Sequence, residues 1–215
     1  LYTDPELYKE VTVVRGMAGT FEYGSGMIGG LVQLETKDAS DFTGGVPGYK
    51  LRQTLQYGSN GNQAVSSTIL AWQPTENFEF LGNYTYRSQD IMTDGAGDDV
   101  NPEGFSLPSY ALKGKYTFGA TRNQYLSLSL SDTQSDESDV PYDSFTATSG
   151  SFGNVDREVH SRTAVLTYGF DHPDTDLINV TASLSYADQQ IDSSYVAGSS
   201  PLEGTPGEAS ILALA

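Results

Sequence analysis

A regular alternation of apolar and polar residues most constrains how this chain can fold. From residue 49 onward, roughly seven segments of about ten residues each alternate in this way. In one of them Phe78, Phe80 and Tyr84 share one parity, whereas Glu79 and Asn83 share the other. Successive side chains of a β-strand point to opposite faces, and an amphipathic helix would repeat with a different period. The pattern therefore predicts an all-β chain of antiparallel strands.

The connections between these segments also follow a rule. After a first hairpin, short turns at residues 74–77, 119–123 and 171–176 alternate with long acidic loops at 91–106 and 132–156, and residues 191–208 are expected to be a loop. In a membrane β-barrel the short turns lie on one side of the bilayer and the long loops on the other. Aromatic residues near segment ends fit the girdles of such a barrel: Trp72, Phe78, Tyr110, Phe118, Tyr168 and Phe170. No apolar run is long enough for a transmembrane helix, but transmembrane strands need none.

Composition excludes several classes of function. The 215 residues hold 11 Lys and Arg against 28 Asp and Glu, which gives a formal net charge of −17. Because such a field repels phosphates, binding to nucleic acid through overall charge is excluded. The chain has no cysteine, so it has no disulfide, thiol nucleophile or thiolate metal site.

A glycine-rich stretch, residues 10–41, precedes the alternating segments. Strands are expected at residues 11–14 and 31–36, with one or two helical turns at 17–23. Gly24 to Gly29 spell G-x-G-x-x-G, but a dinucleotide site needs that motif to open a helix, and here a strand follows. A glycine-rich hairpin without further function is the simpler alternative.

The same stretch resembles a known family. Arg15-Gly16, the YGSG at 23–26, Gly29-Gly30 and the TKDASD at 36–41 are similar to the end of the plug domain in TonB-dependent outer-membrane receptors, and closest to their haem and haemoglobin branch. Met17 departs from the family pattern, which usually has proline there. The motif covers only the first part of the chain.

The resemblance implies an architecture and a function. Residues 1–43 would be the C-terminal part of a plug domain, and 49–215 the first part of a transmembrane barrel of about 22 strands when complete. The function would be TonB-dependent uptake of haem or a ferric siderophore across the outer membrane of a Gram-negative bacterium, without enzymatic activity. Expected partners are the iron compound or a haem-carrying protein, the TonB complex through a more N-terminal segment, and outer-membrane lipid or lipopolysaccharide; nucleic acid is not a partner.

Site residues follow from the same resemblance. The motif residues are expected to be structural, with the glycines allowing close packing and Arg15 pairing with carboxylates of the barrel wall: Arg15, Gly16, Tyr23, Gly24, Gly26, Gly29 and Gly30. Aromatic residues of the long loops are expected to contact ligand: Phe105, Tyr142 and Phe145.

The sequence indicates no catalytic site, no resident cofactor and no metal site. His160 and His172 are the only histidines, they lack paired-ligand spacing, and surface positions are the simpler interpretation. The acidic run 94–98 could bind Ca²⁺ weakly, although it lacks EF-hand spacing and a solvated loop is the simpler alternative.

Two other classes of protein fit parts of the pattern. One is an outer-membrane barrel or surface adhesin that binds without transport. The other is a soluble all-β hydrolase or lectin, which would need polar outer strand faces, whereas the segments at 78–86 and 110–118 each have an apolar face.

Overall fold

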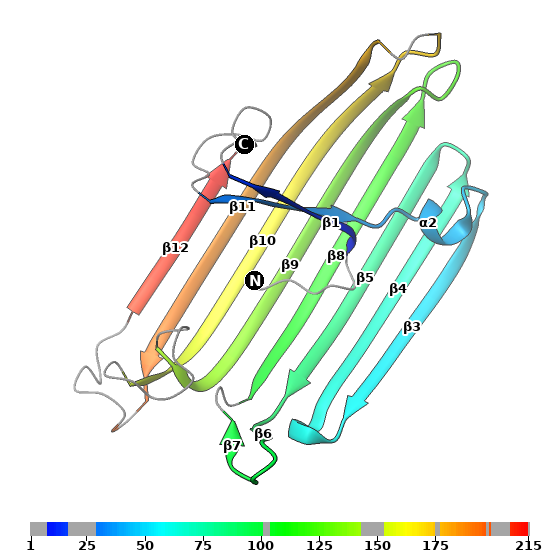
Figure 1. Cartoon of the computed structure of the whole chain (residues 1–215). Helices are drawn as coiled ribbons and strands as arrows, with labels where there is room; N and C mark the ends of the chain where they lie inside the picture. The colour runs from blue at the N-terminus through cyan, green and yellow to red at the C-terminus, as the bar shows by residue number, and fades with distance from the viewer. Residues whose placement is uncertain are drawn as a thin grey trace.

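One curved antiparallel sheet forms most of the molecule. The computed structural model describes residues 8–16, 29–100, 104–142, 153–174, 177–196 and 198, and the backbone of 207–214. The sheet has eight strands in the order β12-β11-β10-β9-β8-β5-β4-β3 (Figure 1). Its strands are β3 (Gly48–Gly58), β4 (Gln63–Thr75), β5 (Phe78–Gln89), β8 (Phe105–Phe118), β9 (Gln124–Pro141), β10 (Asn154–Asp171), β11 (Asn179–Tyr195) and β12 (Gly207–Leu214). Successive strands are neighbours throughout, so the expectation of antiparallel strands is confirmed.

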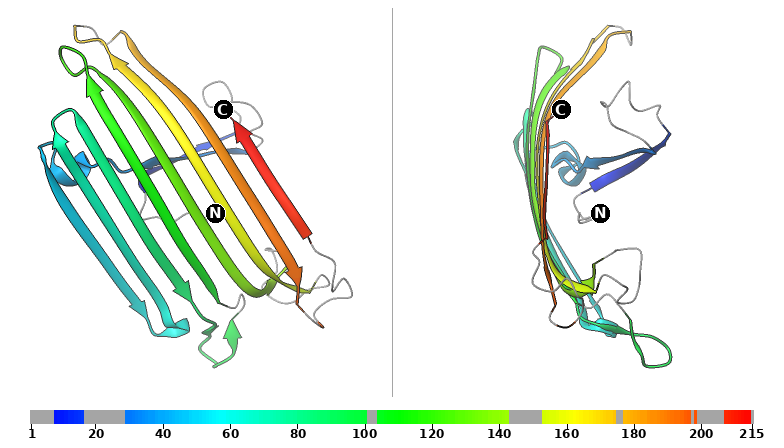
Figure 2. Two further views of the ribbon diagram at one scale, coloured as in Figure 1. Left: turned by 180° about the vertical axis from the view of Figure 1, so that it is seen from behind. Right: turned by 90° about the vertical axis from the view of Figure 1, so that its left-hand side faces the viewer.

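The two faces of the sheet have the reverse of a soluble protein's polarity. The concave face, seen edge-on in Figure 2, buries small polar side chains such as Ser67, Thr85 and Ser109. The convex face exposes large apolar ones, among them Leu55 at 74% and Leu184 at 64%. A continuous apolar outer face is what a strand wall needs when lipid surrounds it.

The two ends of the sheet differ in their connections. At one end of the sheet little sequence separates successive strands, at residues 76–77, 119–123 and 172–178. At the other end longer stretches of sequence separate β5 from β8, β9 from β10 and β11 from β12. The predicted alternation of short turns and long loops is therefore confirmed. At the long-loop end, two short strands, β6 (Met92–Thr93) and β7 (Asp99–Val100), pair with each other.

Three loop boundaries were predicted wrongly. Strand β9 continues to Pro141 and β10 starts at Asn154, so much of the expected loop 132–156 is strand. Strand β8 already begins at Phe105, inside the expected loop 91–106. Strand β11 reaches Tyr195 and β12 follows, where a loop at 191–208 was expected. In the β9 extension both faces are polar, as in SDESD at 135–139, so the backbone ladder continues where hydrophobic alternation has ended.

A β-hairpin crosses the concave side of the sheet. Strands β1 (Tyr8–Arg15) and β2 (Gly30–Thr36) pair antiparallel, which confirms both expected strands. Figures 1 and 2 show the hairpin running across the long strands rather than along them. Gly30 has φ +150°, and a Cβ there would lie 2.5 Å from the carbonyl oxygen of Val14, so this position requires glycine. The expected helical turns at 17–23 lie outside the described residues.

A short connector, residues 37–47, joins the hairpin to the sheet. It contains one helical turn, α2 (Ser40–Thr43), which ends at Gly44 in the left-handed conformation. Ala39 is fully buried against Ile69, Ala71 and Leu81 of the sheet, with Phe42 packed beside them. None of the helices in the described part of the chain combines the length and apolar character needed to cross a membrane.

Candidate functional site

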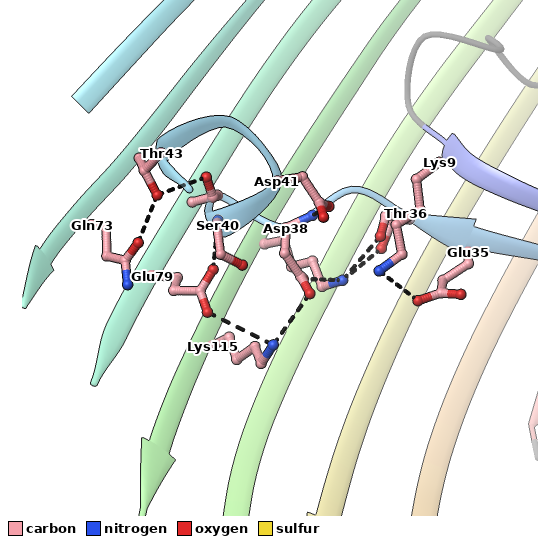
Figure 3. A network of polar contacts seen from close by, with 12 residues as sticks. Lys9, Glu35, Thr36, Asp38, Ser40, Asp41, Thr43, Gln73, Glu79 and Lys115 are labelled. Carbon is pink, nitrogen blue, oxygen red and sulfur yellow. Dashed lines mark hydrogen bonds and ion pairs between the residues drawn. The ribbon is translucent and has the colours of Figure 1, made fainter. Parts of the chain in front are cut away.

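The connector is fixed to the inner wall by a network of polar contacts. Figure 3 shows side chains of the hairpin end and the connector facing side chains of β4, β5 and β8. These wall residues share the inward parity of their strands, because Glu79 pairs in register with Lys115. Residues distant in sequence therefore meet where the hairpin joins the sheet. We call this network the junction: Thr36, Asp38, Ser40, Thr43, Gln73, Glu79, Lys113 and Lys115.

Asp38 is the centre of the junction. Its Oδ1 lies 2.5 Å from Nζ of Lys113, and its Oδ2 lies 3.2 Å from Nζ of Lys115. The Asp38 side chain is only 14% exposed, and that of Lys113 is 15% exposed. Lys113 also donates hydrogen bonds to the carbonyl oxygen and hydroxyl of Thr36, at 3.2 and 3.0 Å. One carboxylate thus binds two lysines of one strand.

Burial and the lysines act on Asp38 in opposite directions. Burial raises the pKa of its carboxyl, but the hydrogen bond and charge of Lys113, with the charge of Lys115, outweigh this effect. The pKa of Asp38 therefore lies below its ordinary value. The ionised carboxylate is the form that holds the connector on the wall.

Glu79 forms the second anchor. Its Oε2 accepts a hydrogen bond of 2.7 Å from the backbone N–H of Ser40 at the start of α2, and its Oε1 lies 3.7 Å from Nζ of Lys115. Glu79 is 8% exposed. A buried carboxylate needs such partners, because unpaired it would carry a large desolvation cost.

A neutral contact completes the junction. The hydroxyl of Thr43 donates to Oε1 of Gln73 at 2.6 Å. Gln73 is 3% exposed, so this contact is also shielded from water. The connector is consequently attached to three consecutive wall strands in the sheet order, β4, β5 and β8.

The predicted motif residues lie apart from the junction. Arg15 is exposed at the end of β1, and within the described residues no ion pair joins it to a carboxylate of the sheet, so its role stays a prediction. Gly16 donates a backbone hydrogen bond of 3.1 Å to Gly29, next to Gly30 at the hairpin end. Tyr23, Gly24 and Gly26 lie outside the described residues.

The predicted ligand residues lie at the long-loop end. Phe105 begins β8, and Tyr142 follows the end of β9. The Tyr142 ring stacks on that of Tyr195, with centroids 5.6 Å apart and planes 12° apart. Arg157 donates hydrogen bonds to the carbonyl oxygens of Pro141 and Tyr142 at 3.2 and 3.0 Å. Phe145 lies outside the described residues.

The histidines and the acidic run form no metal centre in the described part of the chain, where no group of three ligating residues occurs. His160 lies beside Asp132, with Nε2 2.9 Å from Oδ1. His172 accepts a hydrogen bond from the N–H of Asp174. Asp94 accepts bonds from the N–H groups of Ala96 and Asp98, which lower its pKa.

The junction itself was not predicted as a site. Strand parity already placed Glu79, Lys113 and Lys115 on the polar face, and acidic and basic residues at matching heights on one face are a signal for pairing. The strand pattern does not identify the partners of these three residues, because Asp38 and Ser40 reach this face only through the path of the connector.

Known proteins share both sequence and fold with this chain. It is 26% identical over 194 residues to the Hemin receptor of Yersinia enterocolitica, a match that covers 89% of this chain and 27% of that protein. It is 41% identical over 75 residues to TonB-dependent heme receptor A of Haemophilus influenzae, which covers 34% of this chain and 10% of that protein. The resemblance to TonB-dependent receptors is confirmed.

The structural comparison agrees with this relationship. The FrpB iron transporter from Neisseria meningitidis, in its apoprotein form, matches 99% of this chain with a TM-score of 0.74, at 19% identity. The match covers 32% of the transporter. The predicted fold class, an all-β segment of a large outer-membrane barrel, is thereby confirmed. No protein-family model matches the chain.

These relatives are considerably longer than the chain, which spans about a quarter of the Hemin receptor. The relatives are receptors and transporters by name, and none of the names is that of an enzyme.

Proposed function

We propose that the protein containing this chain takes up an iron compound across the bacterial outer membrane and depends on TonB for energy. The observation that carries this proposal is the sheet's reversed polarity combined with a connector that is ion-paired to the inner face and carries the hairpin. An apolar convex face suits lipid, and a buried Asp38 between two lysines suits a plug fixed inside a wall. The transport acts without catalysis.

The same proposal assigns the parts of the chain. Residues 1–43 belong to the plug domain, and 49–215 form the first strands of the barrel. The plug motif residues are structural, and Arg15 pairs with wall carboxylates. Energy reaches the plug through a TonB-binding segment closer to the protein's N-terminus. Lipid and lipopolysaccharide surround the convex face.

The ligand is haem in preference to a ferric siderophore. Two relatives are named as hemin or heme receptors. The ligand is captured by Phe105 and Tyr142 at the long-loop end and by Phe145, because aromatic rings suit a flat macrocycle. A haem-carrying protein is a second source of the same ligand.

Deletion of the gene in its source bacterium tests the proposal. Growth is measured with haem, with haemoglobin or with ferric siderophores as sole iron source. We expect loss of growth on haem and haemoglobin, and its restoration by the intact gene. Unchanged growth on every iron source would overturn the proposal. Growth lost on a siderophore alone would keep transport and overturn the choice of haem.

A non-transporting adhesin is the alternative, and the junction disfavours it. Binding alone does not require a separate hairpin that buried charges of the connector hold across the inner face of the barrel.

A further inference from the structure

A cavity adjoins the junction on the side away from α2, and Leu34, Tyr125 and Val165 form the apolar part of its lining. It has a volume of about 520 Å³ and lies between β2 of the hairpin and the inner faces of β8 to β11. Hydroxyl groups line the wall side, at Ser127, Ser129, Thr167, Thr181 and Ser183. Lys113, Lys115 and Asp38 border the same space.

The fixed and open sides of the hairpin are therefore different. Toward β4 and β5 the connector is held by Thr43, by Ser40 and by the apolar contacts of Ala39. Toward β9, β10 and β11, the described part of β2 faces a hydroxyl-lined space instead. The connector is thus packed against β4 and β5, whereas open space already lies between β2 and strands β9 to β11.

Charge gives this space a ligand preference. Lys113 and Lys115 lie on the same face of β8, and the Asp38 carboxylate binds both of them at once. When the connector leaves the wall, Asp38 leaves with it, whereas Glu79 belongs to the wall and stays near Lys115. Lys9 and Glu35 of the hairpin also line the cavity, but they form an ion pair with each other. Two lysines then face the cavity against one remaining wall carboxylate, so the site becomes cationic.

We propose that Lys113 and Lys115 form a transient binding site for carboxylate groups of the transported solute, and that Asp38 occupies this site while the connector is docked. The inference rests on the proposed function, because it assumes that transport displaces the connector. The position of the Asp38 carboxylate in the docked connector is then the position at which a solute carboxylate binds as the solute passes β8. Haem carries two propionate groups, which are carboxylates. Release of Asp38 from the two lysines is the step that makes them available to these groups.

Two substitutions separate this site from a purely structural contact. Asp38→Asn removes the competing carboxylate and leaves both lysines in place. Lys113→Met with Lys115→Met removes the cations and keeps apolar side chains of similar length. If the junction were only an anchor, both changes would weaken docking and affect transport alike.

Uptake by whole cells carrying the complete receptor is the first test. The probes are haem and haem dimethyl ester, in which both propionates are esterified. With surface binding unchanged, we expect the double lysine variant to take up haem about tenfold more slowly and the ester at the wild-type rate, whereas Asp38→Asn keeps haem uptake. Equal loss for both solutes, or equal loss in both variants, would overturn the inference. Uptake of neither solute by the wild type would overturn the proposed function instead.

Citrate binding to the purified complete receptor in detergent is the second test and needs no transport. We expect Asp38→Asn to bind citrate, measured by calorimetry, at least about tenfold more tightly than the wild type. Adding both lysine changes to that variant should abolish the gain. Indistinguishable citrate binding in Asp38→Asn and in the combined variant would overturn the inference.

Discussion

The carboxylate of Glu79 on strand β5 accepts a 2.7 Å hydrogen bond from the backbone N–H of Ser40 in the connector. The first turn of a helix leaves its N–H groups without partners, and an anion there satisfies them. A wall carboxylate thus helps to fix the connector helix on the inner face.

Glu79→Leu should loosen the connector. It removes the acceptor for Ser40 and one partner of Lys115, so docking is expected to weaken by about 1–3 kcal/mol. The measurement is the rate of tryptic cleavage at Lys37 in the folded receptor, which should rise. Glu76→Leu is the matched control, because Glu76 pairs with Arg122 at an exposed turn, where such pairs contribute little. A cleavage rate that Glu79→Leu leaves unchanged would contradict the assigned role.

Acid should release the connector through Asp38. Its pKa is lower in the docked connector than in a released one, so the ion pairs stabilise docking fully above the ordinary carboxyl pKa of about 3.9. This stabilisation is lost as the pH falls toward and through the lowered pKa. The probe is a fluorophore on Val46→Cys, which is exposed at 61%. A transition confined to acidic pH is expected, and Asp38→Asn should abolish it; a transition that persists in Asp38→Asn would exclude Asp38 as its cause.

A charged side chain should lower the stability of the barrel much more on the outer face of the sheet than on the inner face. Leu55 and Gln56 are neighbours on β3, both exposed, and point to opposite faces. Leu55→Arg should destabilise the barrel in lipid by up to about 2–4 kcal/mol, and Gln56→Arg much less. Urea unfolding of the complete receptor in vesicles measures both. Equal effects would contradict the assignment of the convex face to lipid.

Gly169 should be essential for the position of Tyr125. A Cβ at Gly169 would collide with the Tyr125 ring, over which Nζ of Lys115 lies 5.4 Å from the centroid. Gly169→Ala is expected to cost about 1–3 kcal/mol of unfolding free energy, as overpacking does. Gly114→Ala is the control, since nothing lies within 4 Å of its Cβ position. If both variants unfold at the same urea concentration, the packing argument is wrong.

The sequence was informative where apolar and polar residues alternate and in the strands of the hairpin, and it was less informative at the strand ends and in the junction. Alternation at 78–86 placed β5 correctly because one face of this strand is apolar and the other polar. The extension of β9 to Pro141 escaped prediction because residues 131–139 are polar on both faces of the strand. Strand pairing there depends on the neighbouring backbone of β10, which hydrophobicity does not report.

The junction shows a second limit of sequence patterns. Alternation along 110–118 places Lys113 and Lys115 on the polar face of the strand, yet their partner lies in the connector. Contacts between an anchor and a wall depend on the path of the chain between them. The resemblance of the glycine motif implied an ion pair between Arg15 and carboxylates of the wall, whereas the described ion pairs of the connector are made by Asp38.

Uptake of iron-55 haem by cells carrying the complete receptor tests the central claim most directly. It is measured in the presence and in the absence of TonB, together with surface binding of haem. We predict that surface binding persists in both strains and that uptake occurs only with TonB. Uptake that is equal in the two strains, or binding without uptake in both, would contradict the account of a TonB-dependent transporter.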